Sequence, residues 1–202
     1  MGSVTTIGIR IGQGRDATAI AVTEVERRAA GENVETHFQV RFLDRMPPGT
    51  TYPSVVERLA KIVAGVATRT RSTPTLNVDA TPAEPVLALL REKRLDPIAC
   101  HFNHGGRRNQ VGFREVSIGK GFLVVRLKVL FQTGRLHLPR TREAETLRSE
   151  LIEYDVRLDD DADNRPGAFR VGTHDDLITA LGLAVQDDAD RGPTVTVDRS
   201  LC

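Results

Sequence analysis

The sequence predicts an α/β domain in which a mixed sheet is covered by helices on both faces. Its first 46 residues contain three segments rich in strand-forming residues, without an apolar repeat of helical period. Further on, short apolar strands alternate with segments of helical period, as in crossover connections between parallel strands. The 202 residues and the 40% hydrophobic content suit one domain with a sizeable core. We expect residues 1–190 to form this domain and residues 191–202 to be a loosely held tail.

The N-terminal part is predicted to be an antiparallel three-strand meander. Strands are expected over residues 4–11 and 17–25, joined by the glycine-containing turn "GQGRD", and over residues 33–46. After "PPGTTYP", Pro53 suits the first position of a helix, and apolar residues then recur with helical spacing up to Val66.

The central part is predicted to add strands to this sheet. "PTLNVDA" forms a short buried-type strand that ends on Asp79. A helix is expected next, with Thr81 as its N-cap and Pro82 at its first position. "LDPIACHFN" is a further short strand, and residues 104–115 are expected to form a flexible basic loop.

The C-terminal part is predicted to be mostly helical. "KGFLVVRLKVLFQTGRLHL" suits a strand through its valines and a helix through its leucines, and we favour a helix up to about Gln132, closed by Gly134 and followed by the short extended piece "RLHL". "TREAETLRSELIEYDVRL" begins as a helix and then either continues or turns into a strand, and "DDDADNRPGAF" is an acidic loop. The last helix is expected to follow Thr173 as its N-cap, with Leu177, Ala180, Leu181 and Ala184 on one face.

The composition argues against several functional classes. A net charge of +1 gives no overall field that would attract nucleic acid or a membrane, so any nucleic-acid role must rest on a local patch. The apolar runs are shorter than the roughly 18–20 residues of a membrane span, and we expect no signal peptide. The two cysteines, Cys100 and Cys202, favour reduced thiols in a cytoplasmic setting.

Two places early in the chain carry residues suited to chemistry. The first hairpin sets Asp16 and Thr18 beside glycines that would admit a ligand, although a tight turn in which Asp16 bonds its own backbone is the simpler account. Asp79 ends a buried strand, at the edge where open α/β sheets bind ligands. A structural hydrogen bond is the alternative role for Asp79.

The third place is "THDDLITALGLA", which sets Asp175 and Asp176 in the first turn of the last helix. Acids there complement the helix dipole, but two adjacent acids preceded by His174 exceed what capping requires. Mg²⁺ takes one or two protein carboxylates, and a two-metal site needs acids that converge from separate elements. The hairpin, the strand end and the helix start together meet that requirement.

Several segments, in their order, resemble the nuclease domain of phage terminase large subunits, which has a ribonuclease-H-like fold. They are "IGIRIGQGRDATAIAV", "YPSVVERLAKIV", "LNVDATPAEPVLALL", "FQTGRLHLP" and "GTHDDLITALGLAV". The resemblance implies cleavage of double-stranded phage DNA during packaging, with two Mg²⁺ or Mn²⁺ ions, in the cytoplasm of a bacterial host. By resemblance, Asp79 matches the second family acid, and Asp175 and Asp176 match the paired acids of the third motif. His174 would support these acids.

The chain departs from this family pattern in two ways. Arg10 stands where the family has its first aspartate. The family's full-length motor carries an ATPase domain, but "SIGKGF" does not complete a phosphate loop. The chain is therefore either an excised nuclease domain or a stand-alone relative, with an ATPase motor or other packaging proteins as expected partners.

Arg10 is expected to weaken the metal site. A guanidinium is always charged, and it would repel a divalent ion and pair with Asp79, Asp175 or Asp176. Contact between charges in a partly buried site is worth about 4 kcal/mol, so the free energy of metal binding should become less favourable by several kcal/mol. Asp16 is the candidate replacement ligand, since it stands across the hairpin turn from Arg10.

Basic residues cluster in the sequence between the second and third motifs. They either form a solvated surface or contact the phosphates of a duplex without reading its sequence. The DNA-binding candidates are Arg107, Arg108, Arg114 and Lys120, followed by Arg126, Lys128 and Arg135.

Three functions follow from these observations. The first is a metal-dependent DNA endonuclease of the terminase type, weak or inactive because of Arg10. The second is a DNA-binding or assembly module of the same fold without catalysis. The third, a nucleotide-binding relative of actin and the sugar kinases, needs a second phosphate loop and a second similar half, which 202 residues do not show.

Overall fold

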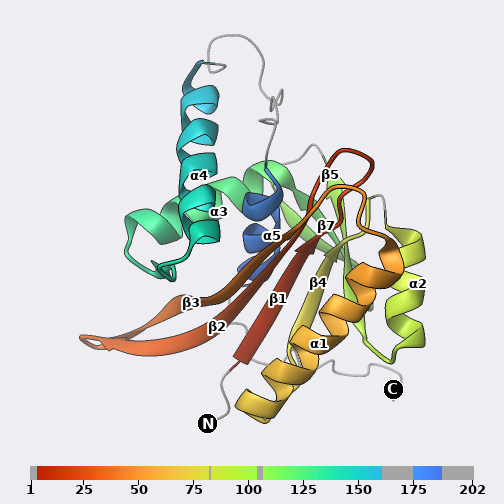
Figure 1. The fold of residues 1–202 in the computed structure, drawn as a ribbon. Coiled ribbons are helices and arrows are strands. Elements are labelled where there is room, and N and C mark those ends of the chain that lie inside the picture. Colours follow the sequence, from red (N-terminus) through yellow and green to blue (C-terminus); the bar gives the residue numbers. More distant parts are fainter. Residues whose placement is uncertain (1–3, 82, 104–106, 161–174, 188–202) are drawn as a thin grey trace, which may run out of the picture.

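The computed structural model describes residues 4–81, 83–103, 107–160 and 175–187. In this part of the chain, eight strands form one sheet in the order β6-β7-β5-β4-β1-β2-β3-β8. The strands are β1 (Val4–Arg10), β2 (Thr18–Ala30), β3 (Asn33–Met46), β4 (Thr75–Asp79), β5 (Pro97–Asn103), β6 (Arg108–Gly112), β7 (Glu115–Gly119) and β8 (Leu136–His137). The helices are α1 (Tyr52–Thr70), α2 (Glu84–Glu92), α3 (Lys120–Gln132), α4 (Arg142–Asp160) and α5 (Asp176–Ala184) (Figure 1).

The strand pairing confirms the predicted mixed sheet. β1, β2 and β3 pair in antiparallel fashion as a meander. β4 then pairs with β1 in parallel, β5 with β4, and β7 with β5. The carboxyl ends of β1 and β4 therefore lie at the same edge of the sheet, which brings Arg10 and Asp79 together.

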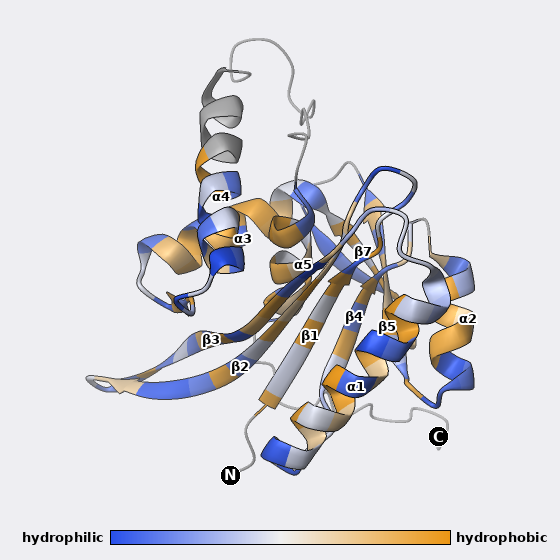
Figure 2. Ribbon diagram, viewed as in Figure 1, coloured by the Kyte–Doolittle hydropathy of each residue, from blue (hydrophilic) through white to orange (hydrophobic). Residues whose placement is uncertain are grey.

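Helices cover both faces of the sheet, as predicted. Because side chains alternate along a strand, Ile20 and Val22 of β2 face one side, and Ala19 and Ala21 face the other. The first side packs against α1 and α2, and the second packs against α3, α4 and α5. Figure 2 shows apolar and polar residues alternating along α1, and the buried ones, Val55, Val56, Leu59, Val63 and Val66, belong to the core on the first side of the sheet. No helix in the described part of the chain is long and apolar enough to cross a membrane.

The helix predicted near Pro53 begins one residue earlier, at Tyr52. Its N-cap is Thr51, whose hydroxyl accepts a hydrogen bond from the Ser54 N–H at 3.4 Å. The helix ends where Arg71 takes the left-handed conformation with φ of 54°. Local capping and the apolar repeat thus define this helix, as the sequence indicated.

The prediction of a flexible loop over residues 104–115 is wrong for its described part. Residues 108–112 form β6 and residues 115–119 form β7, which pair as an antiparallel hairpin at the edge of the sheet. Val116 and Ile118 of β7 are fully buried beside Cys100, so tertiary pairing with β5 overrides the polar local composition. Gly112 lies at a register shift in this pairing.

The helix predicted from Thr81 and Pro82 begins later, at Glu84, with Ala83 as its N-cap. Thr81 has another role, because its N–H donates to Asp79 Oδ1 at 3.1 Å and its hydroxyl accepts from the Phe102 N–H at 3.2 Å. Those bonds fix the backbone after β4 and postpone the helix. Pro82 lies outside the described residues.

Two further predictions concern the C-terminal helices. The alternative of a strand at the end of "TREAETLRSELIEYDVRL" is wrong, since residues 142–160 form the single helix α4. In the last helix Asp175 is the N-cap, and only Asp176 lies in the first turn. Thr173 and the predicted tail over residues 191–202 lie outside the described residues.

Candidate functional site

The candidate site lies where β1 and β4 end and α5 begins. Asp79 is the last residue of β4, and Asp175 and Asp176 stand at the start of α5. All three aspartates are buried, with side chains 4%, 8% and 7% exposed. Three buried carboxylates at one edge of a sheet are costly, because burial disfavours the charged form, and they require cationic partners.

Gly8 allows α5 to lie directly on β1. A Cβ built at Gly8 would lie 2.0 Å from the carbonyl oxygen of Ala180 and 2.4 Å from the backbone nitrogen of Ala184. The end of the helix is fixed by Asn77, whose Nδ2 donates to the Leu183 carbonyl at 2.9 Å. A glycine in β1 and an amide in β4 therefore position the helix that carries Asp175 and Asp176.

Arg10 lies among the acids of the site. Its Nη1 is 3.6 Å from Asp79 Oδ2, and its Nη2 is 3.4 Å from Asp16 Oδ2. Arg10 also donates to the carbonyl of Ile11, and its side chain is only 13% exposed. Asp16 is 56% exposed and sits across the hairpin turn from Arg10, as the sequence suggested.

Asp175 has a cationic partner of its own. Lys120, the first residue of α3, places its Nζ 3.2 Å from Asp175 Oδ2 and 5.5 Å from the centre of the Phe102 ring. A cation in the first turn of a helix opposes the helix dipole, so Lys120 is held there by the carboxylate rather than by its own helix. The sequence prediction had named Lys120 as a candidate for contact with DNA phosphates, with a solvated surface as the alternative.

Asp176 shares an arginine with a second acid, and the sequence prediction missed both partners. Arg45, near the end of β3, places its Nη2 3.0 Å from Asp176 Oδ2 and its Nη1 3.7 Å from Glu150 Oε1. The Glu150 side chain is 6% exposed and comes from α4. No spacing signal joined position 45 to position 150, because the two residues meet only through the tertiary packing of α4 against β3 and α5.

Burial controls the proton affinity of this cluster. Desolvation raises the pKa of Asp79, opposed mainly by the charge of Arg10 and by hydrogen bonds from Thr81. Desolvation also raises the pKa of Asp176, against the hydrogen bond from Arg45. The pKa of Glu150 rises to about 7, because burial outweighs Arg45 and both nearby aspartates repel its charge. Perturbed carboxyl groups of this kind are typical of functional sites.

The predicted DNA-binding residues lie in several separate places in the structure. Arg107 is exposed, whereas Arg108 pairs with Asp187 at 2.6 Å. Arg114 pairs with Asp96 at 2.9 Å, directly before β5 and so at the end of that strand away from Asp79. His174, predicted to support the acids, lies outside the described residues.

The residues of the site only partly suit divalent metals. Carboxylate oxygens are the ligands that Mg²⁺ and Mn²⁺ prefer. However, Arg10, Lys120 and Arg45 each pair with one of the three buried aspartates. Within the described ranges, no group of three or more His, Cys, Asp or Glu side chains is arranged to hold a metal ion. In this arrangement the acids are neutralised by side chains and do not form a two-metal site.

The mixed eight-strand sheet with helices on both faces defines the class of the fold as ribonuclease-H-like. No protein-family model and no curated protein matches the sequence. Among solved structures, the chain is similar to the large terminase nuclease from thermophilic phage G20c, with a TM-score of 0.59 and 17% identity over 92% of this chain and 82% of that one.

The human cytomegalovirus terminase nuclease domain, soaked with Mn, is also similar. Its TM-score is 0.56, with 15% identity over 93% of this chain and 85% of that one. A G20c nuclease structure with bound magnesium has a TM-score of 0.55 and 17% identity, over 90% of this chain and 80% of that one. The likeness to terminase nuclease domains is thereby confirmed for the fold.

Proposed function

We propose that the chain is a terminase-type nuclease domain that acts on double-stranded DNA during viral DNA packaging, and that Arg10 suppresses its metal-dependent cleavage. The support is one observation: buried acids gather at the edge of the sheet in the fold of terminase nucleases, and the Arg10 guanidinium lies 3.6 Å from Asp79. An ATPase motor domain or other packaging proteins are the proposed partners. The proposed setting is the cytoplasm of a bacterial host.

Arg10 acts in this proposal through charge. Its guanidinium supplies a permanent positive charge to Asp79 and Asp16, which are the carboxylates a divalent ion would need. A charge contact in a partly buried site is worth about 4 kcal/mol, so an incoming ion must overcome both the repulsion and the existing ion pair. Lys120 and Arg45 hold Asp175 and Asp176 in the same way.

A second function keeps the fold without the chemistry. A DNA-binding or assembly module is favoured by the ion pair on each of the three buried aspartates. Since such pairs hold the acids without a metal, the domain would keep its shape and its surface while cleaving nothing.

A plasmid-nicking assay with Mn²⁺ separates the two functions. We expect slow cleavage by the natural chain and a rise of about tenfold or more in Arg10→Asp. Arg10→Lys keeps the charge and serves as the matched control, and Asp79→Ala should abolish cleavage in the Arg10→Asp background. Cleavage by the natural chain as fast as by Arg10→Asp would contradict the suppression. No cleavage by either protein, with duplex binding retained, would establish the module.

A further inference from the structure

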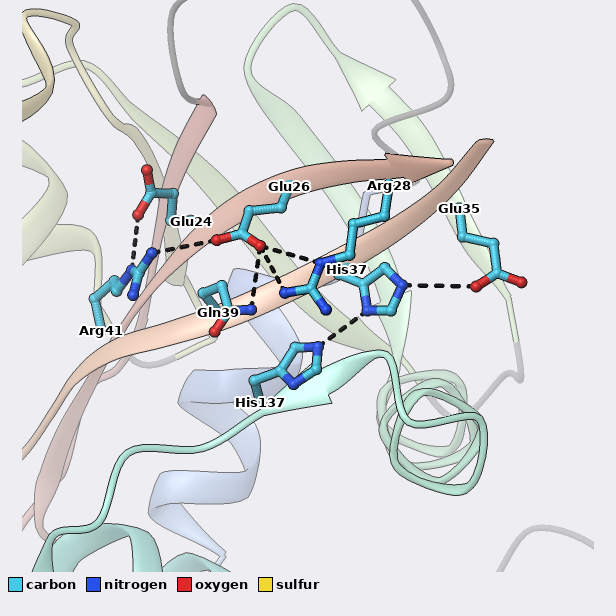
Figure 3. A network of polar contacts seen from close by, with 8 residues as sticks. All are labelled: Glu24, Glu26, Arg28, Glu35, His37, Gln39, Arg41 and His137. Carbon is cyan, nitrogen blue, oxygen red and sulfur yellow. Dashed lines mark hydrogen bonds and ion pairs between the residues drawn. The ribbon is translucent and has the colours of Figure 1, made fainter. Parts of the chain in front are cut away.

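Two histidines meet at the edge of the sheet formed by β3 and β8. His37 lies in β3 and His137 in β8, 100 residues apart in sequence. The two strands pair in parallel, with Gln39 opposite His137, so His37 and His137 are diagonal neighbours on the same face. Figure 3 shows the two rings turned toward each other at the end of a row of polar side chains.

The rings meet nitrogen to nitrogen. His37 Nδ1 and His137 Nε2 are 3.0 Å apart, the ring centres are 5.2 Å apart, and the ring planes differ by 20°. The distance between the ring centres exceeds the distance between the two nitrogens by about twice the distance from an imidazole centre to its nitrogen. The nitrogens therefore lie close to the line that joins the ring centres, and the rings lie edge to edge rather than face over face. One of these nitrogens therefore donates a hydrogen bond to the other, and a metal ion would take the place of the shared proton.

A carboxylate lies on the far side of the first ring. Glu35 Oε2 is 3.6 Å from His37 Nε2 (Figure 3). At this distance Glu35 is an ion-pair partner rather than a hydrogen-bond acceptor, and its negative charge favours a cation at His37.

The other acids of this face are already engaged. Glu26 accepts from Arg28 at 2.7 Å and from Gln39 at 3.3 Å, and it pairs with Arg41 at 3.3 Å. Glu24 accepts from Arg41 at 2.7 Å. The two imidazoles are thus the ligands this face offers, and water would complete the coordination.

We propose that His37 and His137 bind a divalent ion of the Zn²⁺ class, outside the candidate nuclease site. Imidazole nitrogens suit Zn²⁺, Ni²⁺ and Cu²⁺ better than Mg²⁺. Two nitrogens on one tetrahedral zinc, each at about 2.0–2.1 Å, lie roughly 3.3 Å apart, so the pair must open by a few tenths of an ångström, and each ring must turn by roughly 35° to point its lone pair at the ion. The described residues contain no larger group of metal ligands here, so the site is an open, two-histidine one.

Such an ion would strengthen the attachment of β8 to β3, its neighbour in the sheet. β8 has only two residues, paired with Phe38 and Gln39 of β3, and it connects α3 to α4. Those helices carry Lys120 and Glu150, the partners of the acidic cluster. A metal ion bound at this site would therefore stabilise the packing of β8, and with it the segment from α3 to α4 that carries Lys120 and Glu150.

Titration calorimetry with ZnCl₂ tests the site, in a buffer with millimolar Mg²⁺ to compete for carboxylates. The natural chain should bind one Zn²⁺, and His37→Ala and His137→Ala should each weaken binding by about tenfold or more. His101→Ala removes a histidine from β5 and is the matched control, which should bind like the natural chain. Absence of saturable binding, or binding unchanged in both histidine variants, would overturn the proposal.

A measurement on the natural chain removes any dependence on how the variants fold. Co²⁺ added to the protein should shift or broaden the NMR signals of two of the five imidazole rings. Those rings must be His37 and His137, assigned in the natural chain through their covalent connection to the backbone signals of the same residues. Effects on other rings alone would place the ion elsewhere and overturn the assignment.

Discussion

The Arg10 guanidinium lies 3.6 Å from the buried carboxylate of Asp79, between the ends of two neighbouring parallel strands. The register pairs Ile9 with Val78, so the next residue on each strand is Arg10 and Asp79. Backbone pairing alone thus brings the two charges together. If the proposed function is correct, this ion pair decides whether the acidic cluster accepts a metal ion.

The contact between α5 and β1 predicts a large effect of Gly8→Ala. The new Cβ would meet backbone atoms of Ala180 and Ala184 at 2.0 and 2.4 Å, and backbone cannot move aside without displacing the helix. We expect a loss of about 3 kcal/mol in the free energy of unfolding, measured by urea denaturation. Gly65→Ala in α1, where nothing lies within 4 Å, should instead gain up to about 1 kcal/mol. Equal effects of the two substitutions would contradict this role of Gly8.

Glu150 should make the protein less stable as the pH rises. Its pKa is about 7 in the folded state against an ordinary value of 4.5, so the folded state binds the proton more tightly than the unfolded state. Its favourable contribution is complete below pH 4.5 and is lost as the pH rises through 7. Relative to Glu150→Gln, the natural chain should lose up to about 3 kcal/mol between these limits.

The measurement is urea unfolding of both proteins at several pH values. Glu145→Gln, on the exposed side of the same helix, is the matched control and should track the natural chain. If Glu150→Gln shows the same dependence on pH as the natural chain, Glu150 does not titrate in the way its burial predicts.

Arg107 and Arg114 should differ in their effect on DNA binding. Arg107 is exposed and near the carboxyl end of β7, because its carbonyl accepts from the Gly119 N–H at 3.0 Å, whereas Arg114 pairs with Asp96 before β5. Arg107→Ala should weaken duplex binding and reduce the slope of log K against log salt by about 1. Arg114→Ala should leave the slope unchanged. Fluorescence anisotropy with a labelled duplex measures both, and a larger effect of Arg114→Ala would contradict the assignment.

Local sequence signals predicted the parts of the fold that local interactions define. The meander, the helix after Thr51 and the strand ending on Asp79 follow from alternation, capping and apolar runs. β6 and β7 were missed, because their pairing depends on β5 and on the burial of Val116 and Ile118 rather than on composition.

The residues of the candidate site likewise fall into those that the sequence predicted and those that it did not. Asp79, Asp175 and Asp176 stand at strand or helix ends, where position in the sequence is informative. Arg45 and Glu150 are contributed by β3 and α4, and only tertiary packing shows that they share one ion-paired group with Asp176. The cationic partners of the acids are therefore the part of the site that required a structure.

Calorimetric titration of Mn²⁺ into the natural chain and into Arg10→Asp tests the central claim most directly. Loss of the guanidinium and gain of a carboxylate should convert weak or undetectable binding into saturable binding, with affinity higher by about a hundredfold or more. Arg10→Lys, which keeps the positive charge, should bind Mn²⁺ as weakly as the natural chain. Tight Mn²⁺ binding by the natural chain, unchanged in Arg10→Asp, would contradict the claim that Arg10 keeps the metal from Asp79.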